Sequence, residues 1–164
     1  NTKTRETSHI LLVMADKLFS DYLKKTLSRY FQISVLDNPE LLMDTAISQI
    51  PDAIIIDDNV NGISGDILST QIKEDKTIGY IPIILLLRAF DNESYLSHLG
   101  SGADRLGLRT ESICKLRADI LIGWLEIYLY RVNTGLLRFM VKKKLLHSLS
   151  PCKVVTCCPL TEGL

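Results

Sequence analysis

Two adjacent carboxylates, Asp57 and Asp58, are the residues of this chain with the clearest capacity for chemistry. They follow four apolar residues, Ala53 to Ile56, within the stretch PDAIIIDDNVNGISG that runs from Pro51 to Gly65. An apolar run bounded by turn residues is typical of a fully buried β-strand. A carboxylate at the end of such a strand costs free energy unless it is paired or functional. The pair is therefore either a site for chemistry or the remnant of one.

The composition indicates one domain with an appended segment. The chain has 164 residues, of which 46% are hydrophobic and 23% charged, and its formal net charge of zero argues against a nucleic-acid binder that works mainly by charge. Residues 1–130 hold 13 Lys and Arg against 18 Asp and Glu, a net charge of −5, whereas residues 131–164 carry +5. We expect a cytoplasmic protein with reduced thiols, because its four cysteines lack CxxC spacing and no stretch resembles a signal peptide.

Apolar runs alternate with helical periodicity along most of the chain. Strands are indicated by short apolar runs at 9–14, 32–35, 53–56, 80–87 and 104–108. Helices are indicated by amphipathic stretches at 17–30, 38–50, 64–74, 91–99 and 111–130. This alternation predicts an α/β fold with a doubly wound, five-stranded parallel sheet and five helices. Within the second and third helices the buried positions are expected to include Leu41, Leu42, Ala46, Ile47, Ile50, Ile67, Leu68 and Ile72.

The segments ILLV, PDAIIIDDNVNGISG, IPIILL and GAD resemble the response-regulator receiver domain of two-component signalling. The resemblance covers roughly residues 8–130 and implies a flavodoxin-like fold for that domain. Its most specific part is the run of Pro-Asp, an apolar quartet, Asp and then Gly-x-x-Gly, which makes Asp57 the phosphoacceptor candidate. Residues 131–164 remain as a basic helical C-terminal extension.

The same resemblance implies that most of the phosphorylation site is missing. The family's acidic pair after the first strand falls on Met14 and Ala15, with Asp16 one place too late. The Thr or Ser that ends the fourth strand falls on Leu87, and the Lys that ends the fifth falls on Arg109. Phosphoryl transfer needs a divalent metal and a cation around the phosphoryl oxygens. We therefore expect weak or absent magnesium binding, no other cofactor and no catalytic residue.

These substitutions predict a degenerate pocket around Asp57. Arg109 is expected to pair with Asp57 bidentately and to replace the family's Lys permanently. Because neighbouring carboxylates are missing, Asp57 should be easier to keep ionised. We interpret Asp58 as a solvent-facing loop acid and Asp16 as a helix cap. The pocket residues are Met14, Ala15, Asp16, Asp58, Leu87 and Arg109.

The sequence favours a degenerate receiver domain of a two-component or phosphorelay system, which is not an enzyme and acts mainly through protein–protein contacts. Its partner would be a histidine kinase or an output domain, with no small-molecule substrate and no membrane. The alternative is a conventional receiver that a histidine kinase phosphorylates on Asp57, within a larger hybrid sensor or a DNA-binding regulator, so that nucleic acid is reached only through a missing domain. An aspartate-nucleophile phosphohydrolase is disfavoured, because that class requires an Asp and a Thr where this chain has Asn59 and Asn61.

The stretch LLRFMVKKKLLHSLS predicts an amphipathic basic helix over about residues 135–149. A single helix of this length is marginal in water, so its apolar face should find a surface. It either folds back on its own domain or packs on a second copy, and we favour a homodimer through the C-terminal helices. The apolar face consists of Leu137, Met140, Val141, Leu145 and Leu149.

Overall fold

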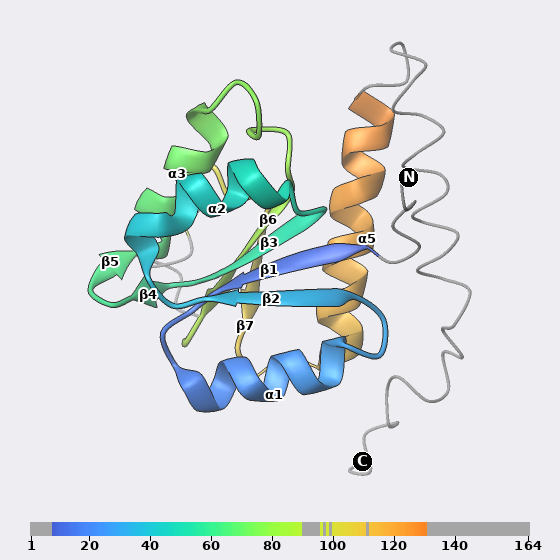
Figure 1. Cartoon of the computed structure of the whole chain (residues 1–164). Coiled ribbons are helices and arrows are strands. Elements are labelled where there is room, and N and C mark those ends of the chain that lie inside the picture. The colour runs from blue at the N-terminus through green and yellow to red at the C-terminus, as the bar shows by residue number, and fades with distance from the viewer. Residues whose placement is uncertain (1–7, 90–95, 97, 99, 111, 131–164) are drawn as a thin grey trace, which may run out of the picture.

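Five parallel strands form one sheet in the computed structural model of the chain (Figure 1), which describes residues 8–89, 96, 98, 100–110 and 112–130. The strand order is β2-β1-β3-β6-β7, and each neighbouring pair is parallel. This order and direction confirm the predicted doubly wound sheet. The strands are β1 (His9–Val13), β2 (Gln32–Leu36), β3 (Ala53–Asp57), β6 (Ile83–Leu87) and β7 (Arg105–Leu108).

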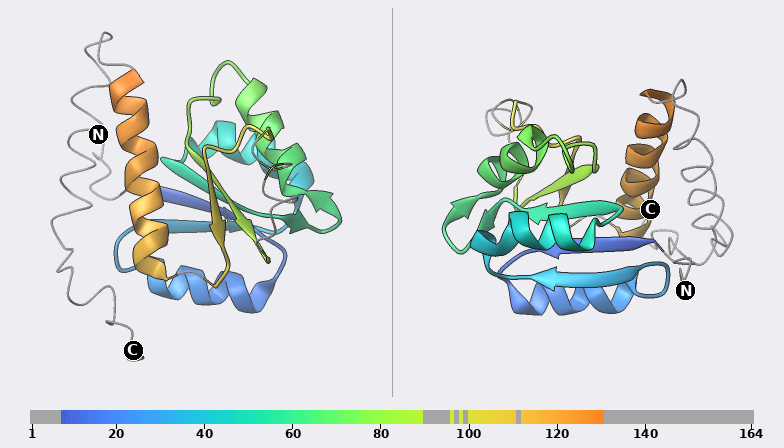
Figure 2. Two further views of the ribbon diagram at one scale, coloured as in Figure 1. Left: turned by 180° about the vertical axis from the view of Figure 1, so that it is seen from behind. Right: turned by 45° about the horizontal axis from the view of Figure 1, so that its top comes forward.

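Helices cover both faces of this sheet. On one face lie α1 (Lys17–Leu27) and α5 (Ile113–Tyr130), and on the other lie α2 (Leu42–Gln49) and α3 (Gly65–Glu74), as Figure 2 shows from two sides. The predicted helix at 91–99 falls largely outside the described residues, and the predicted extension 131–164 falls wholly outside them. No helix within the described part of the chain is long and apolar enough to span a membrane.

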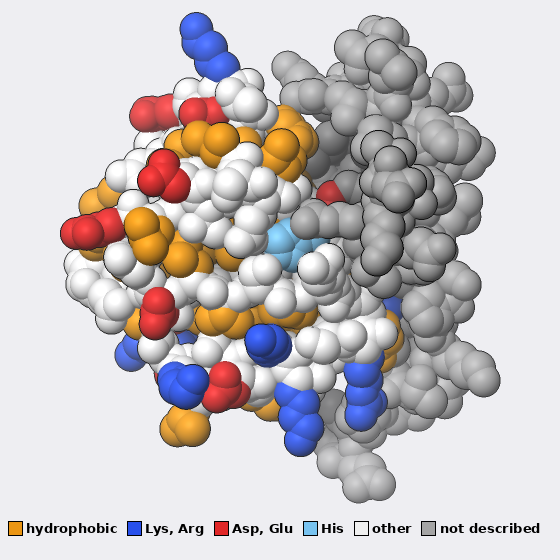
Figure 3. Space-filling model, viewed as in Figure 1, with side chains coloured by type: hydrophobic (Ala, Val, Ile, Leu, Met, Phe, Trp, Pro, Cys, Tyr) orange, Lys and Arg blue, Asp and Glu red, His pale blue; other side chains and the backbone are white. Residues whose placement is uncertain are grey.

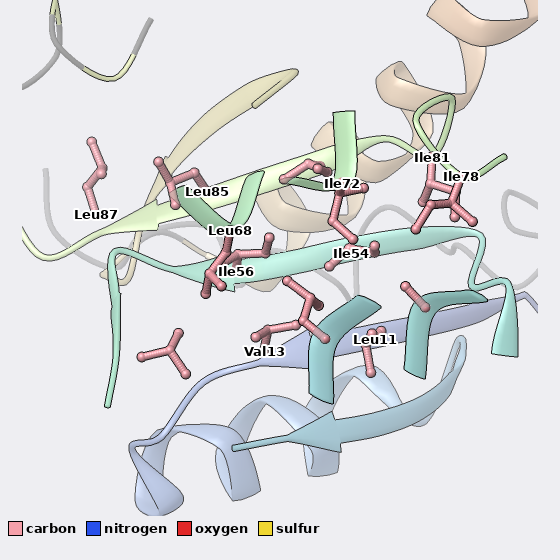
Figure 4. Packing of buried hydrophobic residues seen from close by; sticks show 14 residues of the cluster. Leu11, Val13, Ile54, Ile56, Leu68, Ile72, Ile78, Ile81, Leu85 and Leu87 are labelled. Atoms are coloured by element: carbon pink, nitrogen blue, oxygen red, sulfur yellow. The ribbon is translucent and has the colours of Figure 1, made fainter. Parts of the chain in front are cut away.

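The core consists of two layers of apolar side chains, one on each face of the sheet. All five residues of β1 are buried, and alternate residues belong to different layers. Ile10 and Leu12 pack with α1 and α5, whereas Leu11 and Val13 pack with α2 and α3, in the layer that Figure 4 shows. Strands that are apolar on both faces are thus explained by burial on both faces.

Polar side chains cap the start of three helical segments near the carboxyl edge of the sheet, which are α1, α3 and a 3₁₀ turn. Asp16, Asn38 and Ser64 each accept a hydrogen bond from a backbone N–H of the turn that they begin, and Asn38 caps the 3₁₀ turn η1 (Pro39–Leu41) before α2. Between β3 and α3 the chain also forms a small hairpin, β4 (Asn59–Val60) and β5 (Ile63–Ser64), which we did not predict. Asn61 and Gly62 have φ values of 50° and 88°, which suits an Asn-Gly hairpin turn.

Four apolar residues that we expected to be buried are exposed. The exposed fractions are 48% for Leu41, 45% for Ile47, 49% for Ile50 and 54% for Ile67. The expected buried stripe of α2 was too wide, because η1 ends at Leu41, and the only buried residues of α2 are Leu42 and Ala46, one turn apart. Ile50 leaves the helix in a left-handed conformation, with φ of 44°. In α3 the buried residues are Gly65, Leu68, Ser69 and Ile72, so Ile67 lies outside the buried stripe.

Candidate functional site

Asp57 ends β3 inside the protein. Its side chain is 1% exposed, and both carboxylate oxygens accept hydrogen bonds. Oδ2 lies 2.9 Å from Nη2 of Arg109, and Oδ1 lies 3.1 Å from the backbone N of Asp58. Burial raises the pKa of Asp57 above its ordinary value, Arg109 opposes this rise and Asp58 adds to it. Desolvation thus outweighs the Arg109 charge and keeps the pKa above that of a free carboxyl, while the expectation that missing carboxylate neighbours ease ionisation of Asp57 stays a prediction.

Arg109 follows β7 and lies above the carboxyl edge of the sheet. Its backbone N donates to the carbonyl of Leu87 at 3.0 Å, which extends the pairing between β6 and β7 by one residue. The predicted contact between Arg109 and Asp57 is confirmed by the 2.9 Å distance, but the predicted bidentate form is wrong. Only Nη2 reaches Asp57, because the guanidinium is shared with a second acid and stacks on the ring of Phe19, 4.3 Å from its centroid.

Asp16 is that second acid. Its Oδ1 accepts from the backbone N of Phe19 at 3.1 Å and caps α1, as predicted. Its Oδ2 lies 3.4 Å from both Nη1 and Nη2 of Arg109, a contact that sequence reasoning missed. The hydrogen bond from Phe19 and the Arg109 charge lower the pKa of Asp16. Asp16 belongs to the turn that follows β1. This turn lies at the same edge of the sheet as Arg109, and that shared position was the available signal for the contact.

Asp58 turns away from this cluster toward the end of β6. Its Oδ1 lies 3.6 Å from Nε of Arg88, and its Oδ2 accepts from the Arg88 backbone N at 3.3 Å. The Asp58 side chain is 23% exposed. The interpretation of Asp58 as a solvent-facing loop acid therefore needs correction, because it is half-buried and paired.

The remaining pocket positions are apolar and belong to the core or its margin. Met14 is 1% exposed and packs in the layer of α1 and α5, and Leu87 is 1% exposed and packs in the layer of α2 and α3. Ala15 is partly buried against the same layer as Leu87. None of these three side chains carries an oxygen. Within the described residues, no group of three or more His, Cys, Asp or Glu is placed to hold a metal ion.

The site is thus one guanidinium that bridges two carboxylates from different strand ends. Asp57 comes from β3, Asp16 from the turn after β1, and Arg109 from the end of β7. A side-chain carboxylate with one oxygen held by Arg109 and the other by a backbone N–H is poorly placed to act as a nucleophile. The arrangement can hold three segments of the sheet edge together, and it neutralises a buried charge.

Neither the family models nor the curated proteins include a match to this sequence. Solved structures do match the fold. The signal receiver domain of a histidine kinase from Syntrophus aciditrophicus is 23% identical, with a TM-score of 0.65 over 71% of this chain and 89% of that one. The signal receiver domain of a putative LuxO repressor protein from Vibrio parahaemolyticus is 15% identical, with a TM-score of 0.68 over 79% and 98%.

A third match is the receiver domain of the sensor histidine kinase PA1611 from Pseudomonas aeruginosa, which has a magnesium ion coordinated in its active-site cleft. It is 17% identical to this chain, with a TM-score of 0.65 over 71% of this chain and 96% of that domain. All three are receiver domains, and each is covered over most of its length. This chain therefore has the flavodoxin-like fold of the response-regulator receiver domain.

Proposed function

We propose that this chain is a receiver domain of a two-component or phosphorelay system whose phosphorylation site is inactive. It acts through protein–protein contacts, with a histidine kinase or an output domain as partner, in the cytoplasm, and it is not itself an enzyme. The observation that carries this proposal is the ion pair between Arg109 and the 1% exposed carboxylate of Asp57. The receiver fold supports the signalling class, and the ion pair supports the loss of phosphoryl transfer.

Attack on a phosphodonor requires a free carboxylate oxygen that can reach phosphorus in line with the leaving group. Both oxygens of Asp57 already accept hydrogen bonds, and the side chain has almost no contact with solvent. Freeing Oδ2 means removing Arg109 from Asp57 and leaving a buried carboxylate without its cation, which is costly. Phosphorylation would thus begin with an unfavourable rearrangement that no described residue offsets.

Magnesium would not compensate for this cost at the same edge. The ion prefers several oxygen ligands in a nearly octahedral arrangement. Met14 and Ala15 offer no side-chain oxygen, and the carboxylate oxygens of Asp16 and Asp57 face Arg109 or backbone N–H groups. We therefore propose that magnesium binds weakly or not at all, and that the Arg109 guanidinium takes its place in neutralising Asp57.

The test is phosphorylation of the full chain with acetyl phosphate and magnesium, followed by intact mass spectrometry. We expect no phosphoryl group on wild-type protein or on the matched control Asp57→Asn. Arg109→Lys separates the contribution of the guanidinium from that of the missing carboxylates, and we expect it to remain unlabelled. A mass increase of one phosphoryl group on wild type, absent from Asp57→Asn, would overturn the proposal in favour of a conventional receiver.

A further inference from the structure

Unpaired exposed charges of opposite sign lie on two helices that cover opposite faces of the sheet, α1 and α2. Residues 30–72 contain seven Asp and Glu and no Lys or Arg. Three of these acids are exposed around η1 and α2, and none of the three makes an ion pair with another described residue. With exposed apolar side chains between them they form what we call the α2 surface: Asp37, Glu40, Leu41, Asp44, Ile47 and Ile50.

The opposite pattern occurs on α1 and the turn after it. Four exposed Lys and Arg side chains stand there against one exposed acid, Asp21, and none of the four is paired within the described part of the chain. Two apolar side chains lie among them, with exposed fractions of 86% for Leu18 and 53% for Tyr22. We call this the α1 surface: Lys17, Leu18, Tyr22, Lys24, Lys25 and Arg29.

Both surfaces flank β2, the edge strand of the sheet. Figure 3 shows them on one face of the molecule, with blue side chains along the lower part where α1 lies and orange and red side chains over α2. Between them Val35 of β2 is 39% exposed. Each surface combines exposed apolar groups with unpaired charge of one sign, so each can bury apolar area against a partner surface of the opposite charge.

We infer that this face binds a second copy of the chain, with the α1 surface of each copy against the α2 surface of the other. A two-fold axis along β2 exchanges the two surfaces and forms both contacts at once, so the assembly closes as a dimer. Charge complementarity selects this partner, because a basic surface with apolar side chains is present on the same chain that displays the acidic one. The dimer rests on the proposed function in so far as that function acts through protein contacts.

The inference names a different dimer from the one expected of the C-terminal helices, which lie outside the described residues. It also differs from a fold-back of the basic segment 131–164 on the α2 surface. These possibilities separate experimentally, because only the proposed dimer requires charge on α1. A chain that ends at Tyr130 keeps both surfaces and lacks the basic segment.

The test is sedimentation of the full chain over a concentration series that reaches hundreds of micromolar. We expect a monomer–dimer equilibrium that stops at the dimer and weakens at least tenfold between about 0.05 M and 0.5 M salt, since exposed charges are screened. Glu40→Lys with Asp44→Lys, and separately Lys24→Glu with Lys25→Glu, should each abolish the dimer. Mixing the two reversed proteins should restore it, because their altered surfaces complement each other.

Lys76→Glu is the matched control, because Lys76 is exposed and belongs to neither surface. It should leave the dimer unchanged, and circular dichroism verifies that the reversed proteins fold. A monomer at every concentration overturns the inference, as does a dimer that survives both reversals or is lost on truncation after Tyr130. None of these readouts involves phosphoryl transfer, so a monomer leaves the proposed function standing, and labelling of Asp57 leaves the dimer standing.

Discussion

Replacement of Arg109 by Ala is the most direct test of the bridge at the sheet edge. The change removes a charged hydrogen bond of 2.9 Å to a carboxylate that is 1% exposed, and it removes the guanidinium that stacks on Phe19. Hydrogen bonds to charged groups contribute about 1.5–3 kcal/mol, and a partly exposed cation–π contact adds about 0.5–1 kcal/mol. Hydration of the opened site and protonation of Asp57 offset part of the loss, so we expect a net cost of about 1–3 kcal/mol at pH 7.

Urea unfolding followed by the fluorescence of Trp124 measures this cost. Trp124 is the single tryptophan of the chain, it is 3% exposed, and its Nε1 donates to the carbonyl of Asp52 at 2.8 Å. Its environment should therefore change when the domain unfolds. The matched background is Asp57→Asn, in which Arg109 no longer faces a buried charge. There the same substitution should cost clearly less, and the difference is the coupling free energy of the pair.

The cost should also depend on pH in a direction that the structure sets. Arg109 opposes the rise of the Asp57 pKa that burial causes, so its removal raises that pKa further. The folded variant then takes up a proton more readily than the wild type, and its deficit shrinks as the pH falls through the folded pKa values. A cost below about 0.5 kcal/mol at pH 7, or an equal cost in the Asp57→Asn background, would refute the reasoning.

Further predictions concern nearby groups. Gly65→Ala should destabilise the domain by at least about 2 kcal/mol in urea unfolding, because a Cβ there would lie 2.3 Å from the carbonyl oxygen of Asp57 and 2.4 Å from Cδ1 of Leu85. Lys73→Met should cost about 1–2 kcal/mol, because Nζ lies 2.6 Å from Oδ2 of Asp104, and retained stability would refute this. The Asp57 carboxyl binds its proton more tightly in the folded protein than in the unfolded one, so wild type loses stability as the pH rises from 3.8 through the raised folded pKa. Asp57→Asn has no such carboxyl and should therefore gain stability relative to wild type over this pH range. Magnesium chloride should leave the thermal midpoint of wild type at that of an ionic-strength control, and a dose-dependent rise would contradict the proposed metal-free site.

The sheet and the central ion pair could be predicted because they depend on strong and local signals. Apolar runs of strand length identify buried parallel strands, and their carboxyl ends must meet at one edge. Asp57 ends one such strand and Arg109 follows another, so their approach follows from topology. Topology does not determine whether one or two nitrogens of Arg109 contact Asp57, because that depends on which other groups compete for the guanidinium.

The missed contacts depend on side-chain direction beyond the ends of the strands. Asp16 lies one position later than the acidic pair of the family pattern. It belongs to the turn before α1, where the backbone changes direction, so its position in the sequence does not predict where its side chain points. Periodicity also overestimated the burial of Ile47 and Ile50. Within the eight residues of α2 only Leu42 and Ala46 are buried, and the 3₁₀ turn η1 changes the helical phase before α2 begins.

The bridge gives the buried charge of Asp57 a partner that cannot dissociate from the chain. A bound ion stabilises a fold by an amount that depends on the logarithm of its concentration relative to its dissociation constant, so the stability of a metal-dependent edge changes with its surroundings. Arg109 is covalently attached to the end of β7, and its contacts with Asp57 and Asp16 require no ion from the solution. An edge held in this way favours one arrangement of the strand ends that it connects. A protein that keeps one arrangement can still signal by presenting a constant surface, and we propose the charged face around β2 as that surface.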